Sequence, residues 1–446
     1  VEERGLYHGS CALVARPASV EEAAEVVRLC AEGGLPIVPQ GGNTGLVGGA
    51  VAARGQILVN LSRMNLIRAL DPVGRTVSVE AGCILADLQA AAADARCLFP
   101  LSLGAEGSCQ IGGNLATNAG GVHVLGYGTT RSLTLGLEVV LPDGRVWNGL
   151  RTLIKDNSGY DLKHLFIGSE GTLGIITAAT LRLFPAPART VTAMAAARSL
   201  TVAGSALAAL QQATGNRMVA CEVLSARAME FTLRHLADAR PPFAKAVPWA
   251  MLTEFHGGDG LRAEVEEGLA ALLEGGVLDD AIVADSSAQA AALWRLREGV
   301  PSAQGIEGGS IKHDISVPPA QMEAFVDRAT RAVEAASPGV RVVAFGHLGD
   351  GNLHFNLSQP VHSDRNTFAA EGEKLNQIVH KIAVELGGSI SAEHGIGLAK
   401  AAELARLYAP VEIDLMRSVK RALDPAGILN PGKILGDDDP TTPPTT

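Results

Sequence analysis

The residues best suited to chemistry in this chain lie in the stretch 344–356, which reads AFGHLGDGNLHFN. Its Asp350-Gly351 dipeptide favours a two-residue type I′ turn between two short β-strands. A two-residue loop would place His347 directly opposite His354, with Cβ atoms roughly 4.5–5.5 Å apart on one side of the hairpin. Two imidazoles at that separation suit one divalent metal ion.

A carboxylate and a third imidazole follow later in the chain, at Glu393 and His394. Two histidines and one glutamate form a three-ligand set that leaves coordination positions open for a substrate, as a catalytic metal requires. The same set also occurs in non-haem iron oxygenases. Taken alone, these segments fit equally well a polar cross-strand pair beside an unrelated Glu-His dipeptide.

Three glycine-rich segments could bind an anionic cofactor through backbone N–H groups, because glycine places no Cβ in the way. They span residues 39–49, 104–121 and 165–174. The first is neither the GxGxxG fingerprint of a Rossmann unit, because no long helix starts there, nor a P-loop, because it lacks the Gly-Lys-Ser/Thr ending. One such loop could merely reverse the chain. Three in one domain predict an extended nucleotide lying along the backbone.

The elements that must position these residues change character near residue 186. Up to that point short strands alternate with glycine-rich loops and few helices. A capping box, Ser19 to Glu22, opens the first helix. The expected helices span 20–32 and 85–95, and the expected strands span 35–38, 57–61, 76–80, 135–141 and 175–183.

Beyond Pro185-Ala-Pro187 the chain is rich in alanine and in helix-forming patterns. Strands and helices alternating in this way predict a separate α+β layer domain built on an antiparallel sheet, to which the hairpin belongs. The expected helices span 199–216, 262–275, 318–336, 366–386 and 410–423, and the strands lie near 191–196, 218–224 and 248–255. The tail from Asp437 to Thr446 is predicted to be disordered.

Length and composition limit the number of domains, the kinds of partner and the cellular compartment. A chain of 446 residues needs two or more domains. The net charge of −10 and the lack of any basic run argue against nucleic acid. No stretch approaches the roughly 20 apolar residues of a membrane span. Six scattered cysteines suit reduced thiols in a cytosol-like compartment. We expect a cytoplasmic protein or one peripheral to the cytoplasmic side of a membrane, with an upstream targeting sequence left open because no initiator Met is present.

Seven motifs in matching order resemble the FAD-linked oxidoreductases of the vanillyl-alcohol oxidase and p-cresol methylhydroxylase superfamily, in the branch that oxidises D-2-hydroxy acids. The resemblance covers almost the whole chain, and the first loop is most similar to the D-2-hydroxyglutarate dehydrogenase group. It implies an α+β fold with a two-part FAD-binding domain (1–186), a substrate domain with an antiparallel sheet covered by helices (187–386), and a C-terminal segment (387–446) that returns to the FAD domain. The motifs span 39–49, 104–121, 155–161, 168–174, 346–356, 391–400 and 423–433.

By that resemblance the first glycine loop meets the FAD pyrophosphate, the second lies along the cofactor, the third lines the flavin, and Asn430 closes over it. Some superfamily members tether the flavin through a histidine in the first loop. None occurs between Pro39 and Gly49, so we expect non-covalent FAD. The residues so implied are Pro39, Gln40, Gly41, Gly42, Asn43, Thr44, Gly45, Leu103, Gly104, Ser108, Gly112, Gly113, Thr117, Asn118, Glu170, Gly174, Ile176 and Asn430.

The resemblance also assigns substrate carboxylates to the basic residues Arg297 and Lys312. Arginine offers a planar bidentate fork and lysine a compact charge, and a dicarboxylate needs more than one cation. Both could instead be ordinary surface cations. Pro301 stands where the family carries a hydroxyl residue, a departure that weakens the expected contact to the far carboxylate. D-2-hydroxyglutarate leads as substrate, followed by D-lactate, D-malate or another D-2-hydroxy acid.

In this context His347, His354 and Glu393 would bind Zn²⁺, with Mn²⁺ or Co²⁺ as alternatives for the same nitrogen and oxygen ligands. The ion would chelate the substrate 1-carboxylate and 2-hydroxyl and lower the hydroxyl pKa. Adjacent side chains rarely bind one ion, so His394 is assigned as the general base. Asn356, on the same side of its strand as His354, would hydrogen-bond the substrate.

The expected reaction is FAD- and metal-dependent oxidation to a 2-oxo acid, with hydride transfer from Cα to flavin N5. Two alternatives are an oxidase that passes electrons to O₂ and a non-catalytic FAD-binding subunit of a larger electron-transfer complex. Because the chain has no cysteine cluster, the electrons should leave to a separate carrier, an electron-transfer flavoprotein or a quinone. A homodimer is a candidate assembly.

Overall fold

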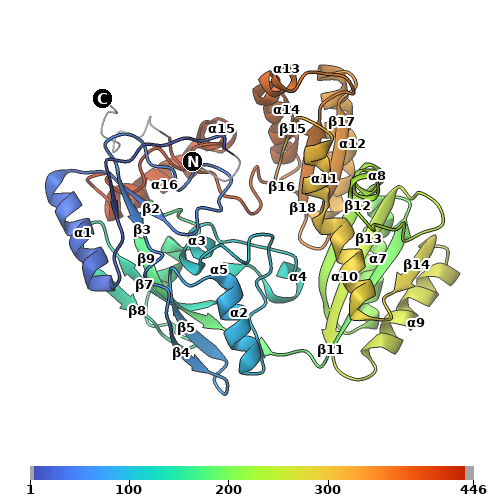
Figure 1. The fold of residues 1–446 in the computed structure, drawn as a ribbon, viewed down its shortest axis with the longest axis horizontal. Helices are drawn as coiled ribbons and strands as arrows, with labels where there is room; N and C mark the ends of the chain where they lie inside the picture. Colours follow the sequence, from blue (N-terminus) through green and yellow to red (C-terminus); the bar gives the residue numbers. More distant parts are fainter. Residues whose placement is uncertain (1–4, 437–446) are drawn as a thin grey trace. The chain divides into compact units, whose positions relative to one another are not determined.

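The computed structural model describes residues 5–436, so the tail that we predict to be disordered lies outside the described residues. The chain divides into two compact units. The first unit holds described residues up to 121, residues 128–186 and the part from 393 onward, and the second unit holds residues 122–127 and 187–392 (Figure 1). The division after residue 186 coincides with the predicted domain border, whereas residues 122–127 and 387–392 fall in the second unit.

The first unit is built on a three-stranded parallel sheet, a five-stranded antiparallel sheet and one strand pair. The parallel sheet has the order β1 (Leu13–Ala15), β3 (Ile57–Asn60), β2 (Ile37–Gln40). The antiparallel sheet has the order β4 (Ile67–Asp71), β5 (Thr76–Glu80), β9 (Ile175–Arg182), β7 (Thr134–Val140), β8 (Val146–Gly149), and the pair is β10 (Phe184–Pro185) with β6 (Cys97–Leu98).

The first helix of this unit begins and ends at residues suited to capping. The Ser19 side chain accepts a hydrogen bond from the Glu22 backbone N–H, and Gly34 ends the helix in the left-handed conformation at φ 60°. The predicted N-cap at Ser19 is confirmed, whereas the Glu22 side chain accepts from the Ala18 backbone N–H at 2.8 Å and not from the Ser19 N–H of a full capping box. The helices are α1 (Val20–Gly33), α2 (Leu85–Asp94), α3 (Ile111–Ala116), α5 (Thr130–Leu133), α6 (Lys163–Phe166), α15 (Ala401–Leu407) and α16 (Pro410–Leu423).

The end of the described chain returns to the first unit, as the resemblance implies. Ile37 in β2 donates a backbone hydrogen bond to Ile428 at 2.7 Å, and Asn430 donates one back to Ile37 at 2.7 Å. Ile428 and Leu429 are buried in the same hydrophobic cluster as Ile37. These contacts add a segment from the far end of the sequence to the core of the parallel sheet.

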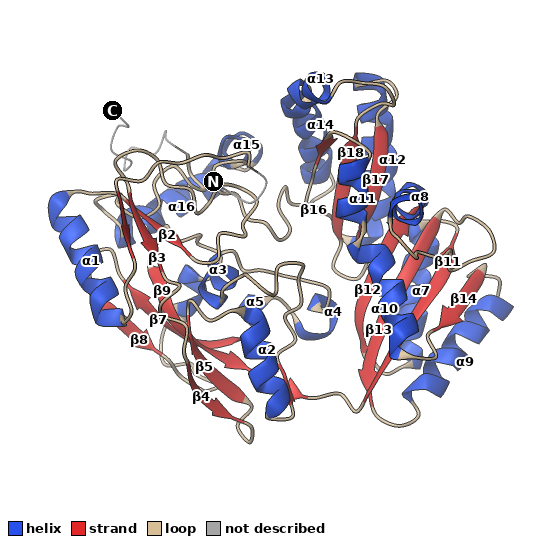
Figure 2. Cartoon of the chain, in the orientation of Figure 1, coloured by secondary structure: helices blue, strands red, loops and turns tan. Residues whose placement is uncertain are grey.

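The second unit is a mixed helix and sheet layer structure around one antiparallel sheet (Figure 2). Its order is β14 (Asp280–Val283), β11 (Arg189–Ala197), β13 (Trp249–Gly257), β12 (Met218–Ser225), β17 (Arg341–His347), β18 (Asn352–Ser358), β15 (Ser310–Ile311), with β16 (Ile315–Ser316) also paired to β18. The predicted α+β class with an antiparallel sheet is confirmed.

Helices cover both faces of this sheet. Along β11, Ala193 and Ala195 join one hydrophobic cluster while Met194 and Ala196 join another, because successive side chains point to opposite faces. Strands buried on both faces read as continuous apolar runs. The elements are α4 (Val124–Tyr127), α7 (Leu200–Ala213), α8 (Ala226–His235), α9 (Leu261–Glu274), α10 (Ser287–Glu298), α11 (Val300–Ile306), η1 (Pro319–Gln321), α12 (Met322–Ala336), α13 (Arg365–Ala370) and α14 (Gly372–Glu385).

Among residues 5–436, no helix combines the length and the apolar composition that a membrane crossing requires.

Candidate active site

The three glycine-rich segments of the first unit meet one another. A Cβ on Gly42 of the first loop would lie 2.2 Å from the backbone oxygen of Ser108 in the second, so only glycine allows this approach. In the third segment, Gly168 and Glu170 donate backbone hydrogen bonds to residues 115 and 116 of α3, at 2.9 and 2.8 Å. The convergence fits a cofactor that lies along backbone from all three loops.

Several residues assigned to the cofactor hold a backbone conformation that side chains rarely adopt. The positive-φ residues other than glycine include Asn43 (57°), Asn118 (50°), Glu170 (50°) and Asn430 (43°). All four belong to the set implied by the resemblance. Such conformations cost free energy and cluster at functional sites. Positive φ also occurs at residues outside this set, so the contact of the four residues with FAD stays a prediction.

Glu170 and Asn430 also tie the returning segment to the glycine loops. The Glu170 carboxylate accepts backbone hydrogen bonds from Ile396 (2.7 Å) and Gly397 (2.8 Å), and Asn430 Nδ2 donates to the backbone oxygens of Gly49 (3.0 Å) and Glu170 (2.6 Å). Burial raises the pKa of Glu170 despite these bonds. The direct contact of Glu170 with flavin stays a prediction.

The hairpin of the second unit forms, but its predicted register is wrong. His347 lies opposite Asn352 and Phe345 lies opposite His354, so the connection is the four-residue turn 348–351. Leu348 leaves the hairpin because it is buried and its N–H donates to Cys221 of β12 at 2.8 Å.

The corrected register keeps both histidines on one face, because the pairing shifts by two residues and only a shift by one would turn a side chain over. The two rings are diagonal neighbours with centroids 6.1 Å apart, and the His354 ring packs on Phe345 at 4.9 Å. At the turn, Gly351 has φ +80°, and a Cβ there would lie 1.9 Å from the Val317 oxygen.

The predicted third ligand is close to this pair. Glu393 is the next residue in the chain after Ala392, which is the last residue of the second unit. His347, His354 and Glu393 each offer a ligand atom, and these atoms lie within 4.8 Å of one another. The donor set of two imidazoles and one carboxylate suits Zn²⁺. Another group of candidate ligands, with two carboxylates and one imidazole, joins Glu393 and His394 to the buried Asp314.

Glu222 on β12 contacts the candidate ligand His347 and is not among the residues that the sequence reasoning assigned. It is fully buried, its Oε1 contacts His347 Nδ1, and its Oε2 accepts a hydrogen bond from Arg297 Nε. Burial alone would raise the pKa of Glu222, but the charges and hydrogen bonds of Arg297 and His347 outweigh it and lower the pKa to about 2. A carboxylate behind a metal-binding histidine fixes the ring orientation and tautomer.

The signal for Glu222 was present in the sequence. It is the one charged residue in the otherwise apolar run 218–224. Charged residues are rarely fully buried unless paired, so a carboxylate in the middle of a buried strand indicates a partner.

The predicted substrate-binding residues differ in their burial and in their contacts. The Arg297 guanidinium lies 4.8 Å over the Phe345 ring, and only 8% of the residue is exposed. Lys312 is exposed, in the turn between β15 and β16. Asn356 is buried with both ends of its amide engaged: Nδ2 donates to Gln304 at 2.9 Å and Oδ1 accepts from the His313 N–H at 3.1 Å. A substrate contact for Asn356 stays a prediction.

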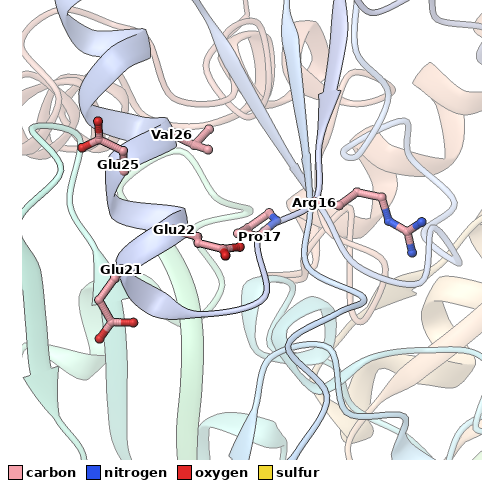
Figure 3. Close-up of a pocket in the computed structure, with 6 residues that line it drawn as sticks. All are labelled: Arg16, Pro17, Glu21, Glu22, Glu25 and Val26. Atoms are coloured by element: carbon pink, nitrogen blue, oxygen red, sulfur yellow. The ribbon is translucent and has the colours of Figure 1, made fainter.

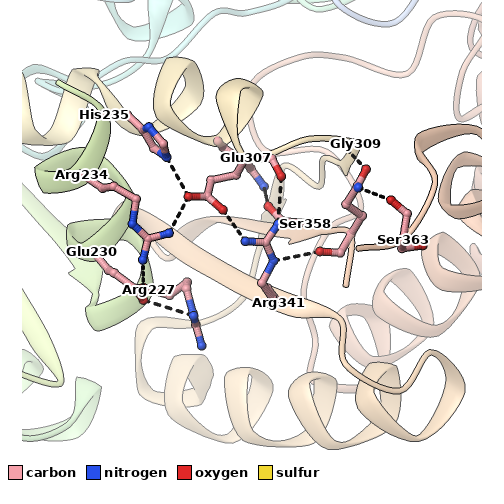
Figure 4. A network of polar contacts seen from close by, with 11 residues as sticks. Arg227, Glu230, Arg234, His235, Glu307, Gly309, Arg341, Ser358 and Ser363 are labelled. Atoms are coloured by element: carbon pink, nitrogen blue, oxygen red, sulfur yellow. Dashed lines mark hydrogen bonds and ion pairs between the residues drawn. The ribbon is translucent and has the colours of Figure 1, made fainter. Parts of the chain in front are cut away.

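Two other polar regions are separate from the predicted site residues. A surface hollow beside α1 is lined by none of them (Figure 3), and its lining residues are Arg16, Pro17, Glu21, Glu22, Glu25 and Val26. In the second unit, Glu307 lies at the centre of an ion-pair network with Arg234, His235 and Arg341 (Figure 4).

Comparison with known families matches both parts of the chain. Residues 11–149 match the FAD binding domain, and residues 186–434 match the C-terminal domain of FAD linked oxidases.

Curated relatives are similar over nearly the full chain. The D-2-hydroxyglutarate dehydrogenase of Xanthomonas citri pv. viticola is 42% identical over 96% of this chain and 90% of that protein. The mitochondrial D-2-hydroxyglutarate dehydrogenase of Arabidopsis thaliana is 39% identical over 96% of this chain and 76% of that protein. The mitochondrial enzyme of Danio rerio is 39% identical over 96% of this chain and 79% of that protein.

Solved structures share the fold at low sequence identity. p-Cresol methylhydroxylase with substrate bound matches with a TM-score of 0.75 and 18% identity, over 95% of this chain and 88% of that one. Alkyldihydroxyacetonephosphate synthase matches with a TM-score of 0.70 and 19% identity, over 94% and 76%. The chain therefore belongs to the FAD-linked oxidase family and is an FAD-linked dehydrogenase similar along nearly its whole length to D-2-hydroxyglutarate dehydrogenases.

Proposed function

We propose that this protein oxidises D-2-hydroxyglutarate, or a related D-2-hydroxy acid, to the 2-oxo acid in a reaction that requires a divalent metal ion as well as FAD. The observation that carries the metal requirement is the group His347, His354 and Glu393, whose ligand atoms lie within 4.8 Å of one another. The names of the relatives supply the substrate class.

In this proposal His347 ligates through Nε2, because Glu222 occupies its Nδ1. His354 and Glu393 complete a three-residue set, which leaves positions on the ion for the substrate carboxylate and hydroxyl. The ion, which we propose to be Zn²⁺, would act as a Lewis acid that lowers the hydroxyl pKa. FAD, when bound, supplies the two-electron acceptor for the hydrogen on C2.

The protein's own side chains then have three tasks. Glu222 takes the Nε edge of Arg297, so a substrate carboxylate would approach the edge formed by the two Nη groups, which is the bidentate fork. Lys312 adds a second cation for a dicarboxylate. His394, next to the ligand Glu393, would accept the hydroxyl proton, a role that imidazole suits near neutral pH.

For the electrons we propose a separate carrier, an electron-transfer flavoprotein or a quinone. Steady-state turnover with each class of acceptor, measured against turnover with oxygen alone, tests this part. Fastest turnover with oxygen would favour the oxidase alternative.

The metal requirement is tested by removing the ion from the FAD-loaded enzyme. Dialysis against EDTA should abolish turnover of D-2-hydroxyglutarate with an artificial acceptor, and Zn²⁺, Mn²⁺ or Co²⁺ should restore it. Unchanged turnover after chelation, with metal content measured as zero, would reject the metal.

The role of His394 has its own test. His394→Ala should keep bound flavin and lose flavin reduction by substrate, with the exposed His362→Ala as the matched control. Preserved reduction in His394→Ala would remove this residue as the base.

A further inference from the structure

A second group of two histidines and one carboxylate lies in the second unit. Glu222 and Glu254 share one face of the sheet, because Glu222 pairs with Leu252 and Glu254 follows two residues later on β13. His256, two residues beyond Glu254, points to the same side. His123 reaches this face from the residue before α4, a helix that packs on β12. None of the three is among the residues assigned to FAD, substrate or the first metal.

The three side chains converge on one point. Oε1 of Glu254 lies 3.0 Å from His123 Nε2 and 3.1 Å from His256 Nε2, and the three candidate ligand atoms lie within 4.8 Å of one another. A tetrahedral zinc ion with bonds of about 2.0–2.1 Å sets its ligand atoms about 3.3 Å apart. The observed separations therefore need little movement to admit an ion. The side chains are 10–16% exposed, which leaves a path for the ion from solvent.

Outer partners hold two of the three ligands in orientation. Trp294 Nε1 donates to the other oxygen of Glu254 at 2.8 Å, and the Tyr127 hydroxyl lies 2.8 Å from His256 Nδ1. Partners on the far side of a ligand are typical of metal sites, where they fix the ring orientation and the tautomer.

The network around Glu307 shows what a purely structural carboxylate looks like in the same unit. Its partners Arg234 and Arg341 are guanidinium groups that cannot ligate a metal, joined by His235 (Figure 4). The partners of Glu254 Oε1 are two imidazoles, the side chains most often used as metal ligands. The alternative for Glu254 is a set of hydrogen bonds in which both Nε2–H groups donate to the carboxylate.

We propose that His123, Glu254 and His256 form a second divalent-metal site, for Zn²⁺ or a similar borderline cation. The donor set of two nitrogens and one oxygen selects this class over Mg²⁺ or Ca²⁺, which favour oxygen. The bound ion would fasten segment 122–127 to β13, which lies far along the chain. It shares no residue with the His347, His354 and Glu393 set, so its occupancy is independent of the first metal.

The experiment uses the full-length, FAD-loaded protein, stripped with chelator and reloaded with Zn²⁺. Bound zinc per chain is measured by atomic emission, and crystals are examined by anomalous scattering at the zinc edge. Wild type should show an anomalous peak among His123, Glu254 and His256. His256→Gln should lose one zinc per chain relative to wild type, and Glu393→Ala should keep that zinc.

His235→Gln is the matched control, because it removes another histidine paired to a buried glutamate in the same unit. It should bind as much zinc as wild type. Equal zinc in His256→Gln and wild type, or no anomalous peak at these residues, would overturn the proposal and leave the hydrogen-bonded network. If His256→Gln does not fold, Tyr127→Phe keeps all three ligands and should weaken zinc binding about 10-fold; unchanged affinity would count against the site.

Discussion

The candidate sites of the two units are built from different groups, backbone in one and side chains in the other. In the first unit the candidate cofactor site is made of backbone: glycine loops in close contact and residues such as Asn43 and Asn118 at positive φ. In the second unit the candidate metal ligands are side chains on one face of the sheet, next to the carboxylates of Glu222 and Glu254. The difference predicts that the first site is sensitive to added volume, whereas the second is sensitive to lost charge.

The largest expected effect comes from adding one methyl group in the first unit. Gly42→Ala places a Cβ 2.2 Å from the Ser108 oxygen, so the first and second loops must separate. We expect the purified variant to lose bound FAD, measured by its visible absorbance. Gly204→Ala on α7 of the second unit is the control, because nothing lies within 4 Å of its added Cβ and the residue is not assigned to the cofactor. Equal flavin content in the two variants would show that close packing of the loops is not what binds FAD.

In the second unit, a change of charge at nearly constant volume should have the next largest effect. Glu222→Gln leaves the buried Arg297 without its carboxylate, and breaking a buried ion pair costs about 3–5 kcal/mol. Removing the carboxylate behind His347 should also weaken metal binding by about 10–100-fold. Chemical denaturation and metal titration measure the two effects. Glu230→Gln, which changes an exposed carboxylate on α8, should alter neither.

We expect Arg297 to distinguish substrates that carry a second carboxylate from those that do not. If its Nη groups bind that carboxylate, Arg297→Ala should raise KM for D-2-hydroxyglutarate about 10-fold or more, the equivalent of about 1.4 kcal/mol, and change KM for D-lactate less. Arg297→Lys, which keeps the charge and loses the fork, should lie between. The exposed neighbour Arg295→Ala is the control. An equal rise in KM for both substrates would indicate that Arg297 stabilises the fold through its ion pair with Glu222 and does not bind the second carboxylate.

The smallest effect on turnover is expected at Glu307, whose carboxylate pairs with Arg234, His235 and Arg341 and has no role in the proposed reaction. Burial would raise its pKa, but hydrogen bonds from His235, Arg341 and Arg234 lower it from 4.5 to about 2. A lowered pKa means that this carboxylate stabilises the fold above about pH 5, and that the stabilisation is lost as pH falls toward 2. Glu307→Gln should cost on the order of 1–3 kcal/mol at pH 7.

Thermal unfolding followed across pH 2–7 measures this effect. The Glu307→Gln variant should lose less stability than wild type over the acid range, and its turnover should match wild type. An acid profile identical to that of wild type would contradict the assignment.

The sequence predicted the strongly patterned elements well. The helix at 85–95 appears as α2 (Leu85–Asp94), and the strand at 218–224 appears as β12. Local signals suffice there, because caps and apolar periods act over a few residues. The expected single helix at 366–386 is two, α13 and α14, divided at Glu371.

Features set by distant contacts could not be predicted from local pattern. The hairpin register follows from Leu348 bonding to Cys221, far back in the sequence, and no dipeptide rule contains that bond. The pairing of Glu222 with His347 likewise depends on β12 lying beside β17. The candidate site residues were assigned by motif and resemblance and stay predictions, whereas the partners of Glu222 could be identified only from the fold.

The most direct test of a metal-dependent D-2-hydroxy-acid dehydrogenase is anaerobic bleaching of the bound flavin in a single turnover. D-2-hydroxyglutarate should bleach the visible absorption band of the flavin, EDTA-treated enzyme should stay yellow, and added Zn²⁺ should restore bleaching. The L-isomer should have no effect. Bleaching by the L-isomer, or bleaching by the D-isomer that survives complete removal of metal, would contradict the account.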